Sequence, residues 1–113
     1  MTNYSAGHEA EKVAAKYLEE CGYQIVDLNW RTRVCEVDIV AKKHQVVYFV
    51  EVKYRSTENQ GGGLEYITPA KLKQMHFAAN CWTQENNYEG DYELSAIEVT
   101  TDFEITRFER SLT

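Results

Sequence analysis

The 113-residue sequence predicts a small α/β or α+β protein with a helix, three strands, a second helix and two closing strands. Two runs rich in β-branched and aromatic residues, 34–41 and 45–55, flank a short polar stretch, which is the pattern of a hairpin. Apolar residues at helical spacing precede this hairpin and recur after Pro69. A chain of this length suits one hydrophobic core, so we expect residues 1–113 to form a single domain.

The first element is a helix that we expect to begin after its cap at Ser5 and to end at Gly22. Its buried face is expected to consist of Ala10, Val13, Ala14, Tyr17, Leu18 and Cys21. Glu9 lies at the border of this face, where the plain interpretation is an acid favoured by the helix dipole. Residues 23–30 then read as the first strand, followed by a polar turn that begins with Arg31.

The hairpin carries charges inside very apolar strands. Side chains alternate between the two faces of a strand, so Glu36 shares a face with Asp38, and Glu51 shares a face with Lys53. Burial-prone carboxylates that lie close together require a cation or a proton between them. Oxygen ligands of this kind suit Mg²⁺ or Mn²⁺. The alternative is a solvated edge hairpin with a simple Glu51–Lys53 ion pair.

The second half of the sequence is divided by clear breaks. Residues 42–44 are expected to form the hairpin turn, and the glycine-rich stretch 56–63 is expected to be a loop that either closes over a substrate strand or simply connects two elements. Thr68 and Pro69 then open the second helix as cap and first residue. The expected buried stripe of that helix is Leu72, Met75, His76, Ala79 and Trp82, and the expected closing strands are 92–99 and 103–108.

Charge and composition limit the functional classes. The net charge of −6 argues against a broadly basic nucleic-acid coat. Residues 1–80 contain ten basic and ten acidic residues, so the acidic balance comes from residues 81–113, which we expect to face away from any phosphate backbone. Residues 1–5 lack the basic and apolar parts of a signal peptide, and no apolar run reaches about 18 residues, so we expect neither a signal peptide nor a membrane-spanning helix. The three cysteines show no metal-ligand spacing, so we expect reduced thiols in the cytoplasm and give a cysteine-based metal or redox role little support.

Asp38 followed by Glu51-Val52-Lys53 resembles the signature of PD-(D/E)xK nucleases. A wider ordered set within residues 5–82 resembles the YraN family of small bacterial endonuclease-like proteins. The matching pieces are Gly7-x-Glu9, Ala14, Tyr17-Leu18, Gly22-Tyr23, Asn29-x-Arg31, residues 36–41, residues 49–53, Arg55 and Lys71. The sequence departs from the family pattern at Cys35, where a glycine is expected, and at residues 92–95, where an Arg-Phe-Asp-like strand is expected.

The resemblance implies a restriction-endonuclease-like fold, a mixed central sheet flanked by helices, similar to that of Holliday-junction resolvases. It implies a metal-dependent DNA endonuclease whose catalytic residues are Asp38, Glu51, Lys53, Glu9 and Glu36. In this interpretation Asp38, Glu51 and the Val52 carbonyl hold Mg²⁺ or Mn²⁺, and Lys53 orients or deprotonates the attacking water. The residues expected to meet DNA phosphates are Arg31, Arg55 and Lys71.

The expected partner is DNA, with branched and junction-containing forms included, and a homodimer is compatible with this expectation. The alternative is a non-catalytic nucleic-acid-binding or scaffold protein with the same fold. The complete set of Asp38, Glu51 and Lys53 favours the enzyme, whereas the acidic balance favours a weak binder.

Overall fold

The computed structural model of the protein describes residues 3–55 and 67–112, so the predicted glycine-rich loop lies outside the described residues. The elements are α1 (Asn3–Glu20), β1 (Gln24–Arg31), β2 (Glu36–Lys43), β3 (Val46–Arg55), α2 (Pro69–Glu85), β4 (Asp91–Thr100) and β5 (Ile105–Glu109). This order confirms the predicted succession of one helix, three strands, one helix and two strands.

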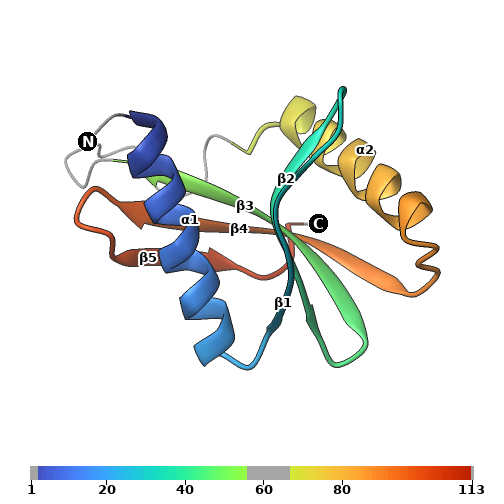
Figure 1. The fold of residues 1–113 in the computed structure, drawn as a ribbon, viewed down its shortest axis with the longest axis horizontal. Coiled ribbons are helices and arrows are strands. Elements are labelled where there is room, and N and C mark those ends of the chain that lie inside the picture. The colour runs from blue at the N-terminus through green and yellow to red at the C-terminus, as the bar shows by residue number, and fades with distance from the viewer. Residues whose placement is uncertain (1–2, 56–66, 113) are drawn as a thin grey trace.

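The strands form one five-stranded sheet in the order β1-β2-β3-β4-β5. The β3 and β4 strands run parallel and the other neighbours run antiparallel, so the sheet is mixed, as expected. Figure 1 shows α1 crossing β3, β4 and β5, whereas α2 lies away from α1 and contacts β2. The α/β class with helices flanking a mixed sheet is confirmed, and this arrangement is compatible with a nuclease-like fold.

Alternation along β3 divides the core into two parts. Val50 packs in the cluster that contains the fully buried Ala10, Ala14 and Leu18 of α1. Its neighbour Phe49 packs against residues of α2 instead. Because side chains two apart share a face, Glu51 and Lys53 lie on the face of the sheet that carries α2.

The ends of the elements have local causes. His44 and Gln45 both have positive φ, 51° and 70°, as a two-residue hairpin turn of type I′ requires. This turn lies slightly later than predicted, because the strand continues to Lys43. The Thr68 hydroxyl accepts a hydrogen bond from the Lys71 backbone N–H at 3.1 Å, which confirms the predicted cap of α2.

Two predictions about the helices are wrong. Helix α1 begins at Asn3, so Ser5 lies within the helix rather than at its cap. His76 is exposed, and the buried residues of α2 are Met75, Ala78, Ala79 and Trp82, a stripe with spacings of three and four. Part of this helix is fixed against β1, because the Trp82 indole N–H donates to Asp27 at 2.9 Å.

Candidate functional site

The candidate site lies where the two central strands separate. Pairing between β2 and β3 runs from Lys43–Val46 to Ile39–Val50 and ends there. Beyond that point Glu51 pairs with β4, and the first residues of β2 pair with β1. The Asp38 carboxylate fills part of the gap, because its Oδ2 accepts a hydrogen bond from the Val52 backbone N–H at 2.8 Å. This point of separation between β2 and β3, which we call the fork, places Asp38 beside Glu51. The paired residues of β2 and β3 end before it, at Ile39 and Val50.

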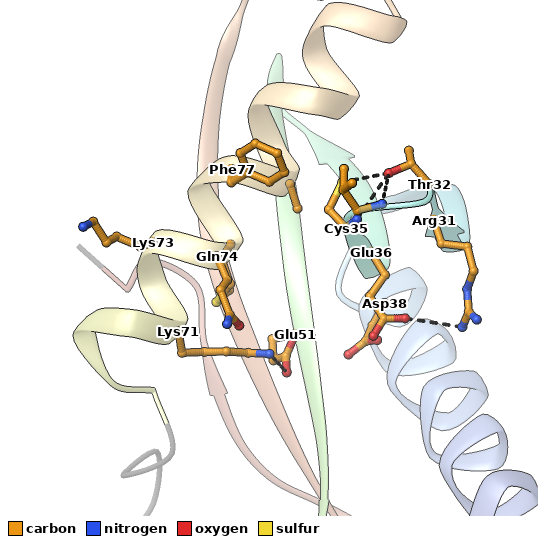
Figure 2. Close-up of a pocket in the computed structure, with 13 residues that line it drawn as sticks. Arg31, Thr32, Cys35, Glu36, Asp38, Glu51, Lys71, Lys73, Gln74 and Phe77 are labelled. Atoms are coloured by element: carbon orange, nitrogen blue, oxygen red, sulfur yellow. Dashed lines mark hydrogen bonds and ion pairs between the residues drawn. The ribbon is translucent and has the colours of Figure 1, made fainter.

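A cleft of about 670 Å³ opens at this fork. It lies between α2 and the segment that joins β1 to β2, as Figure 2 shows. Its lining residues are Arg31, Thr32, Val34, Cys35, Glu36, Asp38, Glu51, Lys71, Lys73, Gln74, Met75, Phe77 and Ala78. The structure therefore brings five predicted site residues to one cleft: Arg31, Glu36, Asp38, Glu51 and Lys71.

Asp38 is the most perturbed carboxyl group of the cleft. Burial raises its pKa to about 8, and the negative charge of Glu51 contributes to the rise. The hydrogen bond from Val52 opposes this rise, while the charges of Glu11 and Glu36 add to it. The surroundings of Asp38 thus favour a bound proton or cation near neutral pH.

Glu51 has a cationic partner in the cleft. The Lys71 ammonium lies 3.0 Å from Glu51 Oε2, and both side chains are partly buried. Figure 2 shows Lys71 reaching across from the first turn of α2 to Glu51 on β3. Lys71 therefore lies on the site side of α2, as the family resemblance implied, but its present contact is a carboxylate.

Helix α1 contributes a carboxylate that the sequence analysis missed. Burial raises the pKa of Glu11, and hydrogen bonds with Asn29 and the Asp38 carboxyl partly offset that rise. The Asn29 amide donates to Glu11 Oε1 at 2.7 Å. A signal was present in the sequence, because Glu11 precedes the buried Ala15 and Leu18 by four and seven residues and so shares their helix face.

The structure does not bring the predicted Glu9 to Asp38. Glu9 Oε1 lies 3.4 Å from the Lys12 ammonium, and this pair is largely exposed. Two residues along a helix differ by about 200° in direction, so Glu9 and Glu11 cannot serve the same site. The helical carboxylate next to Asp38 is Glu11.

Arg31 and Glu36 lie at the exposed side of the cleft. They pair across β1 and β2, with Arg31 Nη2 3.4 Å from Glu36 Oε2. Their side chains are 58% and 64% exposed. Both remain accessible to a ligand that enters the cleft.

Lys53 and Arg55 lie farther along β3 than the cleft. Lys53 shares the face of Glu51, but it is not among the described residues that line the cleft. Arg55 Nη1 lies 3.2 Å from Glu98 Oε2 on β4, and each side chain is only 13% exposed. The sequence predicted a phosphate contact for Arg55, whereas the structure gives it a largely buried carboxylate.

Replacing Arg55 by alanine should therefore destabilise the fold. The substitution leaves the largely buried Glu98 carboxylate without its Arg55 partner. For fully buried pairs, the loss of one partner lowers the free energy of unfolding by about 3–5 kcal/mol. The exposed Arg31 is the matched control, because an exposed pair contributes about 0–1 kcal/mol. Urea unfolding of Arg55→Ala and Arg31→Ala measures the difference. Equal losses of stability in the two variants would contradict the structural role of Arg55.

Two of the three free cysteines meet at the edge of the cleft. Burial raises the pKa of the Cys81 thiol, and a hydrogen bond with Cys35 adds to this rise. Cys35 also lies 3.3 Å from the Thr32 hydroxyl. The residue that replaces the expected family glycine thus packs between the β1–β2 segment and α2.

The donor set of the cleft fits a hydrated divalent ion. Mg²⁺ is commonly held by one or two carboxylates with waters completing its shell, and Asp38 and Glu51 supply such a pair. Among the described residues, no group of three or more His, Cys, Asp or Glu side chains is arranged to hold an ion. The carboxylates of Asp38 and Glu51 are hard oxygen ligands, the kind that Mg²⁺ and Mn²⁺ prefer.

The mixed sheet, the two flanking helices and the forked central strands define an α/β protein compatible with a nuclease-like fold. The chain belongs to the uncharacterised protein family UPF0102, the YraN endonuclease-like family, whose model matches residues 10–109. The family resemblance read from the sequence is therefore confirmed.

Relatives from several bacteria support this assignment. A UPF0102 protein of Chloroherpeton thalassium is 36% identical over 102 residues, which cover 89% of this chain and 79% of the relative. One from a Sulfurihydrogenibium species is 40% identical over 90 residues, covering 80% and 78%. One from Vibrio vulnificus is 34% identical over 82 residues, covering 73% and 67%. Their names give the family and state no activity.

In the described part of the chain, neither helix has the length and apolar character needed to cross a membrane.

Proposed function

We propose that the chain is a Mg²⁺- or Mn²⁺-dependent endonuclease that hydrolyses phosphodiester bonds in DNA, with branched or junction-containing DNA as its substrate class. The observation that carries the proposal is the position of Asp38, which lines the cleft together with Glu51 and accepts a hydrogen bond from the Val52 backbone N–H at 2.8 Å. A cleft that concentrates negative charge around a buried acid favours a cation. The family resemblance supplies the reaction class.

In this proposal Asp38, Glu51 and the Val52 carbonyl hold the ion. A bound divalent ion would lower the pKa of a coordinated water and neutralise charge that develops on the phosphate. Glu36 and Glu11 assist by their hydrogen bonds and charge around Asp38. Glu11 takes the role that the family resemblance implied for Glu9, because Glu11 interacts with Asp38 whereas Glu9 contacts Lys12 at the surface.

The cationic side chains have separate tasks. Lys53, which shares a sheet face with Glu51, orients the attacking water or accepts its proton. Arg31 and Lys71 lie on opposite walls of the cleft and contact phosphates of the bound strand. Arg55 supports β3 through Glu98 and takes no part in the chemistry.

A cleavage assay tests the proposal directly. Purified protein is incubated with labelled linear duplex, flapped duplex and four-way junction DNA, in Mg²⁺, in Mn²⁺ and in EDTA. The expected result is cleavage of the branched forms in either metal and none in EDTA. Absence of cleavage with every substrate and both metals, in protein shown to be folded, would reject the endonuclease.

A non-catalytic nucleic-acid-binding protein is the second candidate. The observation that favours it is the Lys71–Glu51 contact at 3.0 Å, because it occupies a carboxylate oxygen that an ion would need. This candidate predicts metal-independent binding of the same DNA forms without any product. The cleavage assay and a binding assay in EDTA, performed side by side, separate the two.

Glutamine at position 11 should slow cleavage, and glutamine at position 9 should not. Glu11 interacts with Asp38, and groups that support metal ligands typically change activity by about 10–100-fold when they are replaced. Glu9 is the matched control, because its carboxylate contacts Lys12 at the surface. Initial rates of Glu11→Gln and Glu9→Gln at saturating Mg²⁺ provide the comparison. Slower cleavage by Glu9→Gln, with a normal rate for Glu11→Gln, would give the supporting role to Glu9, as the family resemblance implied.

A further inference from the structure

The cleft has apolar side chains at its mouth. Phe77 on α2 is 51% exposed and Val34, in the segment between β1 and β2, is 72% exposed. Both residues line the cleft. Figure 2 shows Phe77 on the helix side of the cleft, across from the wall that carries Cys35 and Thr32. Large apolar side chains at the opening of a charged cleft suggest a ligand with both charged and apolar parts.

A cation and an amide accompany Phe77 on the same helix. Lys73 lies four residues before Phe77, so the two share one face of α2, separated by one turn of about 5.4 Å. Gln74 lies next to Lys73 and also lines the cleft. Lys73, Gln74 and Phe77 are exposed. In the described part of the chain Lys73 has no ion-pair partner, unlike Lys71.

We propose that the mouth of the cleft binds an unpaired nucleotide of a DNA strand, with its base against Phe77 and its phosphate at Lys73. This inference rests on the proposed function and specifies the substrate that the same cleft takes. Val34 covers the base from the opposite wall, and Gln74 can form hydrogen bonds with a base edge. The adjoining phosphate then leads toward Lys71 and the carboxylates at the base of the cleft.

The chemistry of the mouth favours a single strand over a duplex. In a duplex the bases are stacked on each other, so a protruding phenylalanine meets no free base face. An unpaired base offers such a face, and aromatic–base stacking is a recurrent device of proteins that bind single strands. Proteins that bind single strands combine cationic contacts to the backbone with aromatic stacking on bases, and Lys73 and Phe77 supply one group of each kind. A branched substrate supplies unpaired nucleotides at its junction.

Binding in EDTA tests this inference without any cleavage. The probe is a fluorescein-labelled DNA strand of about ten nucleotides, compared with the same sequence as a duplex and with a single-stranded RNA of that sequence. Wild-type protein should bind the DNA strand more tightly than the duplex. Phe77→Ala should weaken binding of the strand by roughly 5- to 100-fold, since aromatic stacking contributes on that order per base. Phe77→Trp should retain the affinity.

Two further variants complete the design. Leu28→Ala is the matched control, because Leu28 on β1 is 48% exposed and lies outside the cleft lining. It should bind as the wild type does. A plot of log affinity against log salt concentration has a negative slope. Lys73→Gln should make this slope less steep by about 0.7, the value for one phosphate contact on a single strand. Thermal melts show whether each variant is folded.

The outcomes are distinct. Equal affinity of Phe77→Ala and Leu28→Ala, a preference for the duplex, or tighter binding of RNA would overturn the inference. Retained strand binding that depends on Phe77, together with no cleavage in either metal, would reject the endonuclease and leave the strand-binding site in place. Cleavage of branched DNA by a Phe77→Ala protein at the wild-type rate, with unchanged strand affinity, would reject this inference alone.

Discussion

Alanine at Asp38 or at Glu51 should reduce metal-dependent cleavage to the background rate. Each residue supplies a carboxylate at the fork that the other cannot replace. Losing one preorganised electrostatic group already lowers rates by about 10²–10³-fold, so losing a metal ligand should lower them by at least this amount. Single-turnover cleavage of a labelled junction in Mg²⁺ measures the loss for each variant.

A carboxylate outside the cleft gives the control for this experiment. Glu109 on β5 pairs with Arg107 at the surface, at 3.4 Å, so Glu109→Ala should cleave at the wild-type rate. Circular dichroism then shows whether each variant keeps its fold. Near wild-type cleavage by a folded Asp38→Ala or Glu51→Ala protein would mean that the reaction occurs elsewhere on the molecule.

The fold was predictable because its local signals agree. Alternation in β2 and β3, the polar hairpin turn, and the Thr68–Pro69 start of α2 each indicate one structure. The fork was not predictable, because it depends on where strand pairing stops, at Ile39 and Val50. The spacing of the sequence predicted that Asp38 lies near Glu51. It could not show that the Val52 backbone N–H donates to Asp38, or that a cleft opens beside the two carboxylates.

The predictions for charged side chains were less complete, for a physical reason. Which partner a long side chain selects depends on neighbours from distant parts of the chain. Lys71 meets Glu51 from another element, and Arg55 meets Glu98 on β4. Glu11 shares the helix face of the buried Ala15 and Leu18, a spacing visible in the sequence, but only the packing of α1 on the sheet shows that this face meets Asp38.

The metal-free protein should be less stable than its Asp38→Asn variant above pH 7. In the folded state the pKa of Asp38 is raised to about 8, against about 3.9 for an unfolded aspartate. A raised carboxyl pKa contributes stability that is fully present below the unfolded pKa and is lost as pH rises through the folded pKa. The wild type should therefore lose stability relative to Asp38→Asn between about pH 4 and pH 8.

Asparagine preserves the shape of the side chain and can still accept the hydrogen bond from Val52. It carries no charge, so it removes the repulsion with Glu51. The two proteins should melt at similar temperatures near pH 4 and diverge as the pH rises. Melting in EDTA across this range measures the divergence. Parallel curves would show that Asp38 is solvated and ionised in the folded protein.

A divalent ion should make the wild type more stable than Asp38→Asn, the reverse of the order expected in EDTA. An ion that binds only the folded state adds about 2.7 kcal/mol at 100 times its dissociation constant. For a domain of this size that corresponds to a rise in melting temperature on the order of ten degrees. Asp38→Asn should show almost no rise, because it lacks one carboxylate of the pair. Melting of both proteins at pH 7.5, with millimolar Mn²⁺ or with EDTA, decides the matter. An unchanged melting temperature of the wild type in Mn²⁺ would remove the metal from the site, whereas equal rises in both proteins would place it elsewhere.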